Sequence, residues 1–300
     1  MPESARDRWA EWLLNRRFGG SVERREKFIE GLMPWRDRVL GNAGVGEGDV
    51  LLDVGAGDGL IAFGALDLVG ESGRVVFSDV SQDLLEYSRT LAEEAGVLDR
   101  CEFVLAPADD LSAIKDASVD AVTTRSVLIY VFNKRGAFRE FHRVLVPNGR
   151  ASVLEPINRF RQPQPPHLFL GYDVTPVRDL AAKVVGVFAR IQPPETDPML
   201  DFDERDLLNL AEEAGFAEIH LDYEAEISTA ATYHGVTDWK TFVKSAGNPK
   251  IPTIEEATDE VLTLEEIARF TAHLRPLVEN ARRKSTSALA FLRAVKGNPA

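Results

Sequence analysis

Cysteine, long apolar runs and an excess of basic charge are all scarce or absent in this chain of 300 residues. Cys101 is the single cysteine, which excludes an intrachain disulfide and a thiolate cluster for zinc, iron–sulfur or arsenic chemistry. No run of about 18 apolar residues occurs, so we expect no membrane span. Lys and Arg number 35 against 48 Asp and Glu, and the net charge of −13 disfavours nucleic acid or an anionic membrane as partner. The charged first residues are unlike a secretory signal, so we expect a cytoplasmic location.

What the chain does contain is a glycine-rich loop behind its first strongly apolar segment. Residues 50–54 read Val-Leu-Leu-Asp-Val, and Gly55, Gly57 and Gly59 follow at alternating positions before an amphipathic segment over 60–69. This order predicts a buried strand, a tight turn and a helix start, which together present backbone N–H groups to a ligand. Glycine is needed there because a Cβ would obstruct both the turn and the approach of the ligand.

Apolar strand segments alternate with amphipathic helical segments through the middle of the chain. We expect strands at 50–54, 74–78, 101–105, 120–124, 150–154, 217–227 and 287–295, and helices at 59–69, 82–96, 134–145 and 203–214. Apolar runs separated by helices predict a doubly wound, mostly parallel α/β sheet that is covered on both faces. Ligands of such sheets bind beyond the carboxyl ends of the strands.

Helical and irregular segments surround this core. Two helices are expected over 4–40, with Ser21 as an N-cap between them and Pro34 kinking or ending the second. The predicted organisation is a helical N-terminal arm (1–40), a core (41–155, 203–230 and 285–300), and two cap insertions (156–202 and the largely helical 231–284). Two long insertions on one sheet are better explained as a substrate cap than as structureless loops.

An acidic residue ends the second strand and bears on the choice of cofactor. Asp79 lies twenty residues after Gly59, where a carboxylate can accept both hydroxyls of a ribose. The cofactor would then contain adenosine, as nicotinamide dinucleotides and S-adenosylmethionine do. Leu60 stands where the dinucleotide fingerprint has its third glycine, and Asp53 and Asp58 would repel a pyrophosphate but suit a cationic ligand. The loop therefore favours S-adenosylmethionine.

With these motifs, the chain resembles the class I S-adenosylmethionine-dependent methyltransferases, and in particular small-molecule enzymes of the quinone-biosynthesis and natural-product type. The resemblance covers residues 40–155 and 203–227, and its motifs are 52–59, 78–81, 108–111 and 141–150. It implies a Rossmann-like fold with a seven-stranded sheet whose last strand is antiparallel. It also implies in-line transfer of a methyl group to nitrogen, oxygen or carbon of a small, aromatic or partly apolar acceptor.

The resemblance also implies which residues contact the cofactor. They are Asp53, Gly55, Gly57, Asp79, Val80, Ala108, Asp109 and Arg125. Asp53 would lie near the methionine ammonium group, Asp79 at the ribose and Asp109 at the adenine amino group. Pro107 stands where the family usually has an acidic residue, which puts the adenine contact in doubt.

Methyl transfer from a sulfonium depends mainly on alignment and exclusion of water, so a general base helps but is not obligatory. Glu155, at the end of the fifth strand, is a candidate base or substrate anchor, unless it is a solvated carboxylate at a loop start. Tyr130 is a candidate for lining the methyl-transfer site. Candidate substrate contacts in the arm and cap are Trp12, Arg16, Phe18, His167, Tyr172, Tyr233 and His234. No metal is expected.

Two alternatives stay open beside a methyltransferase. One is a catalytically inactive S-adenosylmethionine-binding sensor or scaffold on the same fold. The other is a nicotinamide-dependent oxidoreductase, which Asp79 favours and the loop pattern opposes. The sequence leaves open the acceptor, the methylated atom type and whether the chain forms a homo-oligomer.

Overall fold

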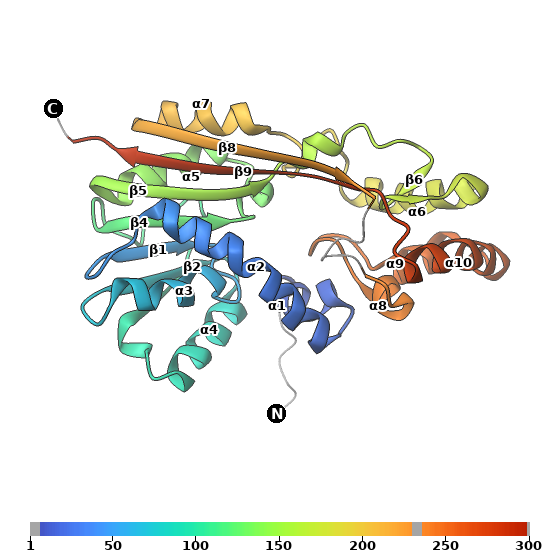
Figure 1. Cartoon of the computed structure of the whole chain (residues 1–300), viewed down its shortest axis with the longest axis horizontal. Coiled ribbons are helices and arrows are strands. Elements are labelled where there is room, and N and C mark those ends of the chain that lie inside the picture. Colours follow the sequence, from blue (N-terminus) through green and yellow to red (C-terminus); the bar gives the residue numbers. More distant parts are fainter. Residues whose placement is uncertain (1–6, 230–235, 299–300) are drawn as a thin grey trace. The chain divides into compact units, whose positions relative to one another are not determined.

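The computed structural model describes residues 7–229 and 236–298 (Figure 1). Its helices are α1 (Arg8–Leu14), α2 (Val22–Ala43), α3 (Leu60–Val69), α4 (Gln82–Glu94), α5 (Lys134–Val144), α6 (Arg178–Ile191), α7 (Glu204–Ala214), α8 (Trp239–Lys244), α9 (Ile254–Val261) and α10 (Leu264–Glu279). Its strands are β1 (Val50–Val54), β2 (Arg74–Asp79), β3 (Cys101–Leu105), β4 (Val119–Arg125), β5 (Leu145–Pro156), β6 (Leu168–Phe169), β7 (Tyr172–Asp173), β8 (Phe216–Ser228) and β9 (Ser285–Lys296). Five short 3-10 helices are η1 (Arg16–Phe18), η2 (Leu98–Arg100), η3 (Leu128–Tyr130), η4 (Asn158–Arg161) and η5 (Thr175–Val177).

The chain divides into two structural units. Unit 1 consists of Met1–Gly31, Phe160–Asp197 and Ala225–Ser287. Unit 2 consists of Leu32–Arg159, Pro198–Glu224 and Ala288–Ala300. Each unit has its own apolar core, so each is described by itself.

Unit 2 is built on a seven-stranded sheet in the order β3-β2-β1-β4-β5-β9-β8. The pairs from β3 to β5 are all parallel, whereas β9 runs antiparallel to β5 and sets Ala290 opposite Glu155. The predicted seven-stranded, mostly parallel sheet with its last strand antiparallel is therefore confirmed.

Both faces of this sheet are covered, which explains the unbroken apolar runs of its strands. Successive strand residues point to opposite faces: Leu51 joins one core cluster and Leu52 the other. The cluster of Leu51 includes Val39 of α2 and side chains of α3, and Figure 1 shows α3 beside β1 and β2. The cluster of Leu52 includes Phe138 of α5 and Leu207 of α7.

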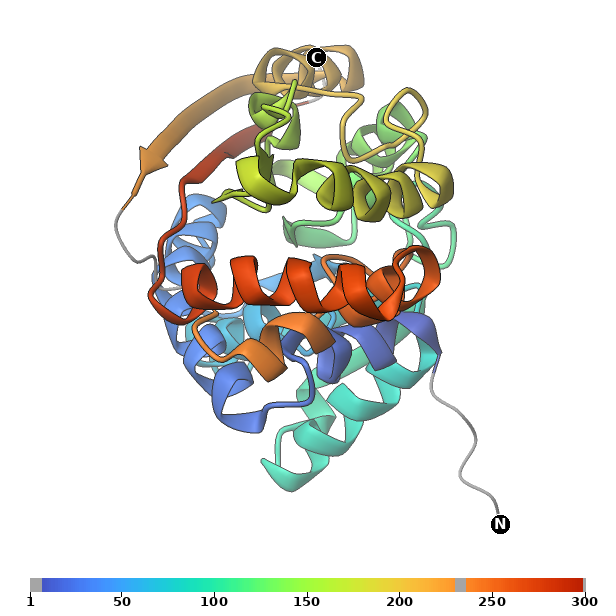
Figure 2. The same ribbon diagram turned by 90° about the vertical axis from the view of Figure 1, so that its right-hand side faces the viewer.

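Unit 1 has a separate core formed by one face of each of its longer helices. Figure 2 shows α6 and α10 running side by side. Val184 of α6 and Leu274 of α10 are fully buried, and the rings of Phe169 and Phe270 meet edge to face with centroids 5.6 Å apart. Each of these two helices therefore has a buried apolar face.

Two details at the helices test the sequence predictions. Ser21 Oγ accepts a hydrogen bond from the N–H of Arg24 at 3.3 Å, as predicted for an N-cap. Helix α2 continues through Pro34, so of the two predicted outcomes, a kink or an end of the helix, the end was wrong. Proline removes one backbone hydrogen bond, and burial of Leu32, Val39 and Leu40 on either side outweighs that loss.

Among the described helices, none combines the length and the apolar character of a membrane span.

Candidate functional site

The glycine loop joins the carboxyl end of β1 to the start of α3. Gly55, Gly57 and Gly59 have φ angles of +68°, +58° and +81°, which are left-handed conformations that favour glycine. Gly59 is the N-cap residue of α3. The predicted strand, tight turn and helix start are therefore confirmed, and the loop lies at the edge of the sheet where ligands of α/β proteins bind.

Gly55→Ala is expected to lower the free energy of unfolding by about 1–3 kcal/mol. The added Cβ would lie 2.3 Å from Cγ2 of Val127, at a position whose φ is +68°. Chemical denaturation measures the loss. Gly41→Ala in α2 is the matched control, because nothing lies within 4 Å of its added Cβ. That variant should gain about 0.5–1 kcal/mol as an ordinary helix substitution. Equal stability of Gly55→Ala and the natural chain would contradict this account of the loop.

Asp79 ties the glycine loop to the end of β2. Its Oδ2 accepts a hydrogen bond from the N–H of Gly57 at 2.9 Å, and its Oδ1 accepts one from the N–H of Ser81 at 2.9 Å. The residue is 7% exposed. Each carboxylate oxygen can accept more than one hydrogen bond, so these bonds leave capacity for a ligand's hydroxyl groups. Val80, which follows, is 50% exposed beside this group.

Asp53 is a second buried carboxylate, on β1. It is 2% exposed, and its Oδ1 accepts a hydrogen bond from Oγ1 of Thr123 at 2.9 Å. Burial raises the pKa of Asp53 to about 7, and the charge of Asp79 adds to that rise, whereas the Thr123 hydroxyl and the Arg125 charge oppose it. Two carboxylates that interact in a dry environment disfavour each other's ionised form. A cationic ligand would relieve this penalty.

Glu155 is fully buried and bonds to the backbone that follows β4. Its Oε1 accepts hydrogen bonds from the N–H groups of Val127 at 2.8 Å and Leu128 at 2.9 Å, and its Oε2 accepts from Ile129 at 3.3 Å. Burial raises the pKa of Glu155 to about 7, with these three hydrogen bonds opposing the rise. Glu155 is 0% exposed, so the alternative of a solvated carboxylate is wrong.

The backbone that Glu155 holds has an unusual conformation at its start. Ser126 has a φ of +58°, and its N–H donates to the carbonyl of Leu154 at 2.8 Å. A non-glycine residue in this region costs energy and is often found at functional sites. Sequence patterns could not have shown that Glu155 anchors this turn, because the two segments are neighbours only through the pairing of β4 with β5.

The remaining predicted residues of unit 2 follow the carboxyl ends of β3 and β4. Ala108 is buried, and Asp109 is half-buried after the exposed Pro107. Arg125 and Tyr130 are half-buried, the first at the end of β4 and the second at the end of η3. The structure thus places all the candidate cofactor residues at one edge of the sheet, and their contacts with a cofactor stay predictions.

The candidate substrate residues of unit 1 divide into buried and exposed groups. Trp12 is buried, and its Nε1 donates to the carbonyl of Ala246 at 2.9 Å. Phe18 is also buried, and Arg16 forms an ion pair of 2.5 Å with Glu256. These contacts give the three side chains structural roles within unit 1. Contact with a substrate stays a prediction for each of them.

The candidate substrate residues of the cap segments also include both buried and exposed side chains. Tyr172 is 2% exposed, and its ring meets that of Phe242 with centroids 5.7 Å apart. His167 is exposed. Tyr233 and His234 lie outside the described residues.

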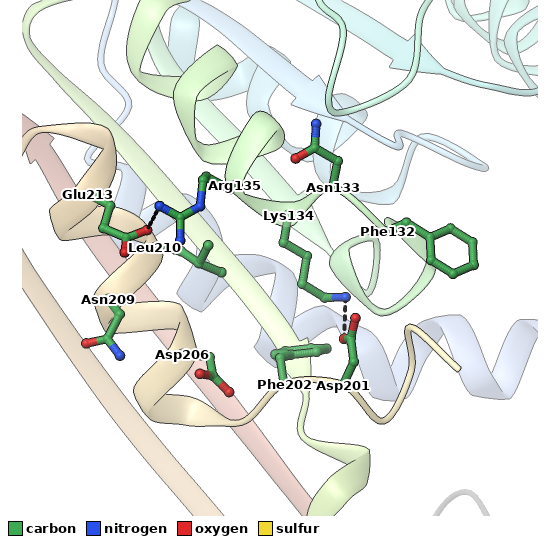
Figure 3. Close-up of a pocket in the computed structure, with 10 residues that line it drawn as sticks. All are labelled: Phe132, Asn133, Lys134, Arg135, Asp201, Phe202, Asp206, Asn209, Leu210 and Glu213. Carbon is green, nitrogen blue, oxygen red and sulfur yellow. Dashed lines mark hydrogen bonds and ion pairs between the residues drawn. The ribbon is translucent and has the colours of Figure 1, made fainter. Parts of the chain in front are cut away.

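A pocket of about 380 Å³ lies in unit 2 between the start of α5 and α7 (Figure 3). Lys134 is 6% exposed, and its Nζ donates to Oδ1 of Asp201 at 2.6 Å and to the carbonyls of Val131 and Pro198. Arg135 pairs with Glu213 at 2.6 Å. Protein groups thus already pair with both of these cations. No pattern in the sequence predicted this pocket.

Comparisons with known proteins identify a family whose model matches this chain. The model of the ubiE/COQ5 methyltransferase family matches residues 32–237. A ubiquinone/menaquinone biosynthesis C-methyltransferase UbiE from Hahella chejuensis is 36% identical over 140 residues, which are 47% of this chain and 54% of that protein. The chain thus spans about half the length of the curated relatives it matches.

Solved structures share the fold at low sequence identity. The YcgJ protein from Bacillus subtilis has a TM-score of 0.53 and 16% identity, covering 88% of this chain and 98% of that one. The [4+2]-cyclase SpnF has a TM-score of 0.50 and 21% identity, covering 89% of this chain and 82% of that one. These likenesses concern the fold alone. The family model covers most of the chain, including the glycine loop and Asp79, and the chain therefore belongs to the ubiE/COQ5 methyltransferase family.

Proposed function

We propose that this chain is a methyltransferase that uses S-adenosylmethionine to methylate a small, aromatic or partly apolar molecule. The observation that carries the proposal is the pair of buried carboxylates, Asp53 and Asp79, beside the glycine loop at the carboxyl ends of β1 and β2. A ligand with ammonium and sulfonium charges suits this acidic site, whereas a pyrophosphate would be repelled. Membership of the family supports the same activity.

The residues present fit this cofactor. The loop over 55–59 would let its backbone approach the methionine part and the ribose, with Asp79 accepting from the ribose hydroxyls. Asp53 would lie near the ammonium group, and Val80, Ala108 and Asp109 near the adenine. When bound, S-adenosylmethionine supplies an electrophilic methyl group on a sulfonium that is already a good leaving group.

The chain's own residues have to align the acceptor and exclude water. Glu155 acts as a positioning residue in this proposal, because its oxygens already bond to the N–H groups of 127–129. It would hold Ser126 and Tyr130 beside the cofactor, so that removal of a proton from the acceptor does not depend on Glu155. Accurate alignment can contribute about 7–11 kcal/mol to a rate, which exceeds the usual contribution of a general base.

The acceptor is proposed from two observations. The matched relatives are named for ubiquinone and menaquinone biosynthesis, which makes a quinone-like ring a suitable first acceptor to test. Residues 1–31 and 238–300 lie outside the family match, and they include α1, α8, α9 and α10. Since these parts of unit 1 are not shared with the family model, a different aromatic natural product is an equally suitable acceptor. A cytoplasmic location stays a prediction.

Asp79→Ala is expected to weaken the binding of S-adenosylhomocysteine by about 1–3 kcal/mol, because a charged acceptor of hydrogen bonds is lost. Calorimetric titration measures the affinity, and Asp67→Ala, at an exposed position of α3, is the matched control. Unchanged affinity in Asp79→Ala would remove the ribose assignment. If the folded natural chain bound no S-adenosylhomocysteine at all, the proposed function itself would be overturned.

Binding of the cofactor would not by itself show catalysis, because the same fold occurs in a protein described as a [4+2]-cyclase. Transfer of a labelled methyl group to a panel of hydroquinones and phenols is the deciding measurement. Slow transfer to any of them would exclude a purely sensory or scaffold role. Titration with NADH in the same buffer separates the chain from an oxidoreductase.

A further inference from the structure

Two charged residues of α5 hold the segment that connects β3 to β4, residues 106–118. Glu140 and Arg143 lie one turn apart on the helix, and Nη2 of Arg143 is 2.7 Å from Oε2 of Glu140. Nε of Arg143 also donates to Oε1 of Glu140 at 2.8 Å, which makes the ion pair bidentate. Such pairs are among the strong polar contacts of proteins. The hydrogen bonds between the two side chains lower the pKa of Glu140 and raise the pKa of Arg143.

The same pair bonds to the backbone of the connecting segment. Arg143 donates to the carbonyl of Leu111 at 2.8 Å and to the carbonyl of Ile114 at 2.9 Å. Oε2 of Glu140 accepts from the N–H of Leu111 at 2.7 Å. The side chains of Leu111 and Ile114 are buried in the core of unit 2. Three backbone groups of the segment are therefore held by two charged side chains of α5.

The start of the connecting segment is attached to the end of β2. The N–H of Ala106 donates to the carbonyl of Asp79 at 3.0 Å. Oγ of Ser78 donates to the carbonyl of Ala106 at 3.3 Å. The segment is thus fixed at Ala106 beside β2 and at Leu111 beside α5, and residues 107–110 lie between the two attachments.

Residues 107–110 form a tight turn. The N–H of Asp110 donates to the carbonyl of Pro107 at 3.1 Å, so that Ala108 and Asp109 are the two central residues. Ala108 is buried and Asp109 is half-buried. Asp109 lies two residues before Leu111, and the direction of its carboxylate therefore depends on the backbone that the pair on α5 fixes.

Holding this turn in advance would strengthen ligand binding. A turn closed by one hydrogen bond opens readily unless the residues on either side of it are held. Ordering the turn at the moment of binding would cost free energy, which a turn held beforehand avoids. A binding group also has to lie within about 0.5 Å of its productive position, and supporting hydrogen bonds provide that accuracy.

We propose that Glu140 and Arg143 are positioning residues for the adenine of the cofactor, because they hold the 107–110 turn so that Asp109 selects a base with an amino group. The proposal rests on the proposed function, in which the cofactor is S-adenosylmethionine and Asp109 accepts from its adenine amino group. It gives a role to the motif over 141–150, whose Arg143 acts on the cofactor through the connecting segment.

The test is calorimetric titration of the full chain with S-adenosylhomocysteine and S-inosylhomocysteine. The inosyl ligand has an oxygen in place of the amino group, so it offers Asp109 no donor at that position. The natural chain should bind the adenosyl ligand about 10- to 100-fold more tightly, as expected for a hydrogen bond to a charged group. Arg143→Met should reduce this ratio to about threefold or less, because the turn is no longer held. Glu140→Gln keeps one oxygen and should give an intermediate ratio.

Arg135→Met is the matched control. Arg135 is also on α5 and also pairs with a carboxylate, at 2.6 Å, but its partner Glu213 lies on α7 and not in the connecting segment. This variant should keep the ratio of the natural chain. A ratio of two affinities does not depend on the fraction of folded protein, so a loss of stability alone leaves it unchanged.

Amide hydrogen exchange provides a measurement that needs no ligand. In Arg143→Met the N–H groups of Asp110 and Leu111 should exchange about 10-fold faster or more, because the segment opens locally. The N–H of Gly57, which donates to Asp79, should exchange at the rate of the natural chain.

The proposal is overturned if the natural chain binds the two ligands equally, or if Arg143→Met and Glu140→Gln keep its ratio. Unchanged exchange at Asp110 and Leu111 would overturn it too, as would failure of both variants to fold, since the pair would then serve the fold alone. If the natural chain bound neither ligand, the methyltransferase proposal would fail and this one with it. Binding of S-adenosylhomocysteine with an unchanged ratio in the variants would contradict this proposal alone.

Discussion

Glu155→Ala is expected to lower the free energy of unfolding by about 3–5 kcal/mol, a large effect for one substitution. Alanine would leave the N–H groups of Val127, Leu128 and Ile129 without their acceptor. An unpaired buried N–H group costs about 1–3 kcal/mol, and three such groups outweigh the gain from removing a buried carboxylate. Urea denaturation monitored by circular dichroism measures the change.

Glu155→Gln separates the structural role from a catalytic one. Glutamine keeps one of the two oxygens, so this variant should lose roughly half as much stability as Glu155→Ala. The matched control is Glu218→Ala, at an exposed position of β8, which should change stability by less than about 0.5 kcal/mol. A loss below about 1 kcal/mol in Glu155→Ala would contradict the anchoring role. If Glu155→Gln instead folded normally and its pH–rate profile lost a limb near pH 7, Glu155 would be a general base.

The buried carboxylate of Asp53 is expected to make the cofactor-free protein less stable as the pH rises from about 4 to about 7, by about 2–4 kcal/mol. Burial raises the pKa of Asp53 from 3.8 to about 7. The folded state therefore binds a proton that the unfolded state has already released in this pH range. The stabilisation is complete below the unfolded pKa and is lost as the pH rises through the folded one.

Asp53→Asn should remove this pH dependence, because asparagine cannot ionise and its oxygen can still accept from Thr123. Without cofactor, the variant should be more stable than the natural chain at pH 8 and similar to it at pH 4. Carboxylates with lowered pKa values, such as Glu140 beside Arg143, produce the opposite trend in both proteins. The difference between the two stability curves therefore isolates Asp53. Parallel curves for the two proteins would contradict the raised pKa.

The same ionisation should be visible in cofactor binding. A ligand ammonium group beside Asp53 favours the carboxylate, so binding at pH 6 should release a proton. Calorimetry in buffers with different ionisation enthalpies measures this release, and it should disappear in Asp53→Asn. The variant would then combine greater stability with weaker cofactor binding.

Local sequence patterns were sufficient to predict most of the helices and strands of the core. The apolar runs of β1 and β2 and the helical periods of α4 and α5 depend on neighbours in the sequence, and their bounds differ from prediction by at most about two residues. Pro34 shows the limit of such local reasoning, because burial of α2 outweighs one missing hydrogen bond. For β5, the pattern predicted residues 150–154, whereas the strand begins at Leu145 because its pairing with β4 resumes across a register shift.

The sequence by itself determined the sheet type, the glycine loop and the position of Asp79 at a strand end, because each depends on residues that lie close together in the chain. Only the tertiary structure decided what the buried charged groups do. Glu155 bonds to the turn at 127–129 because β5 lies beside β4. Burial and hydrogen-bond partners depend on packing between remote segments, and no local pattern of residues encodes them.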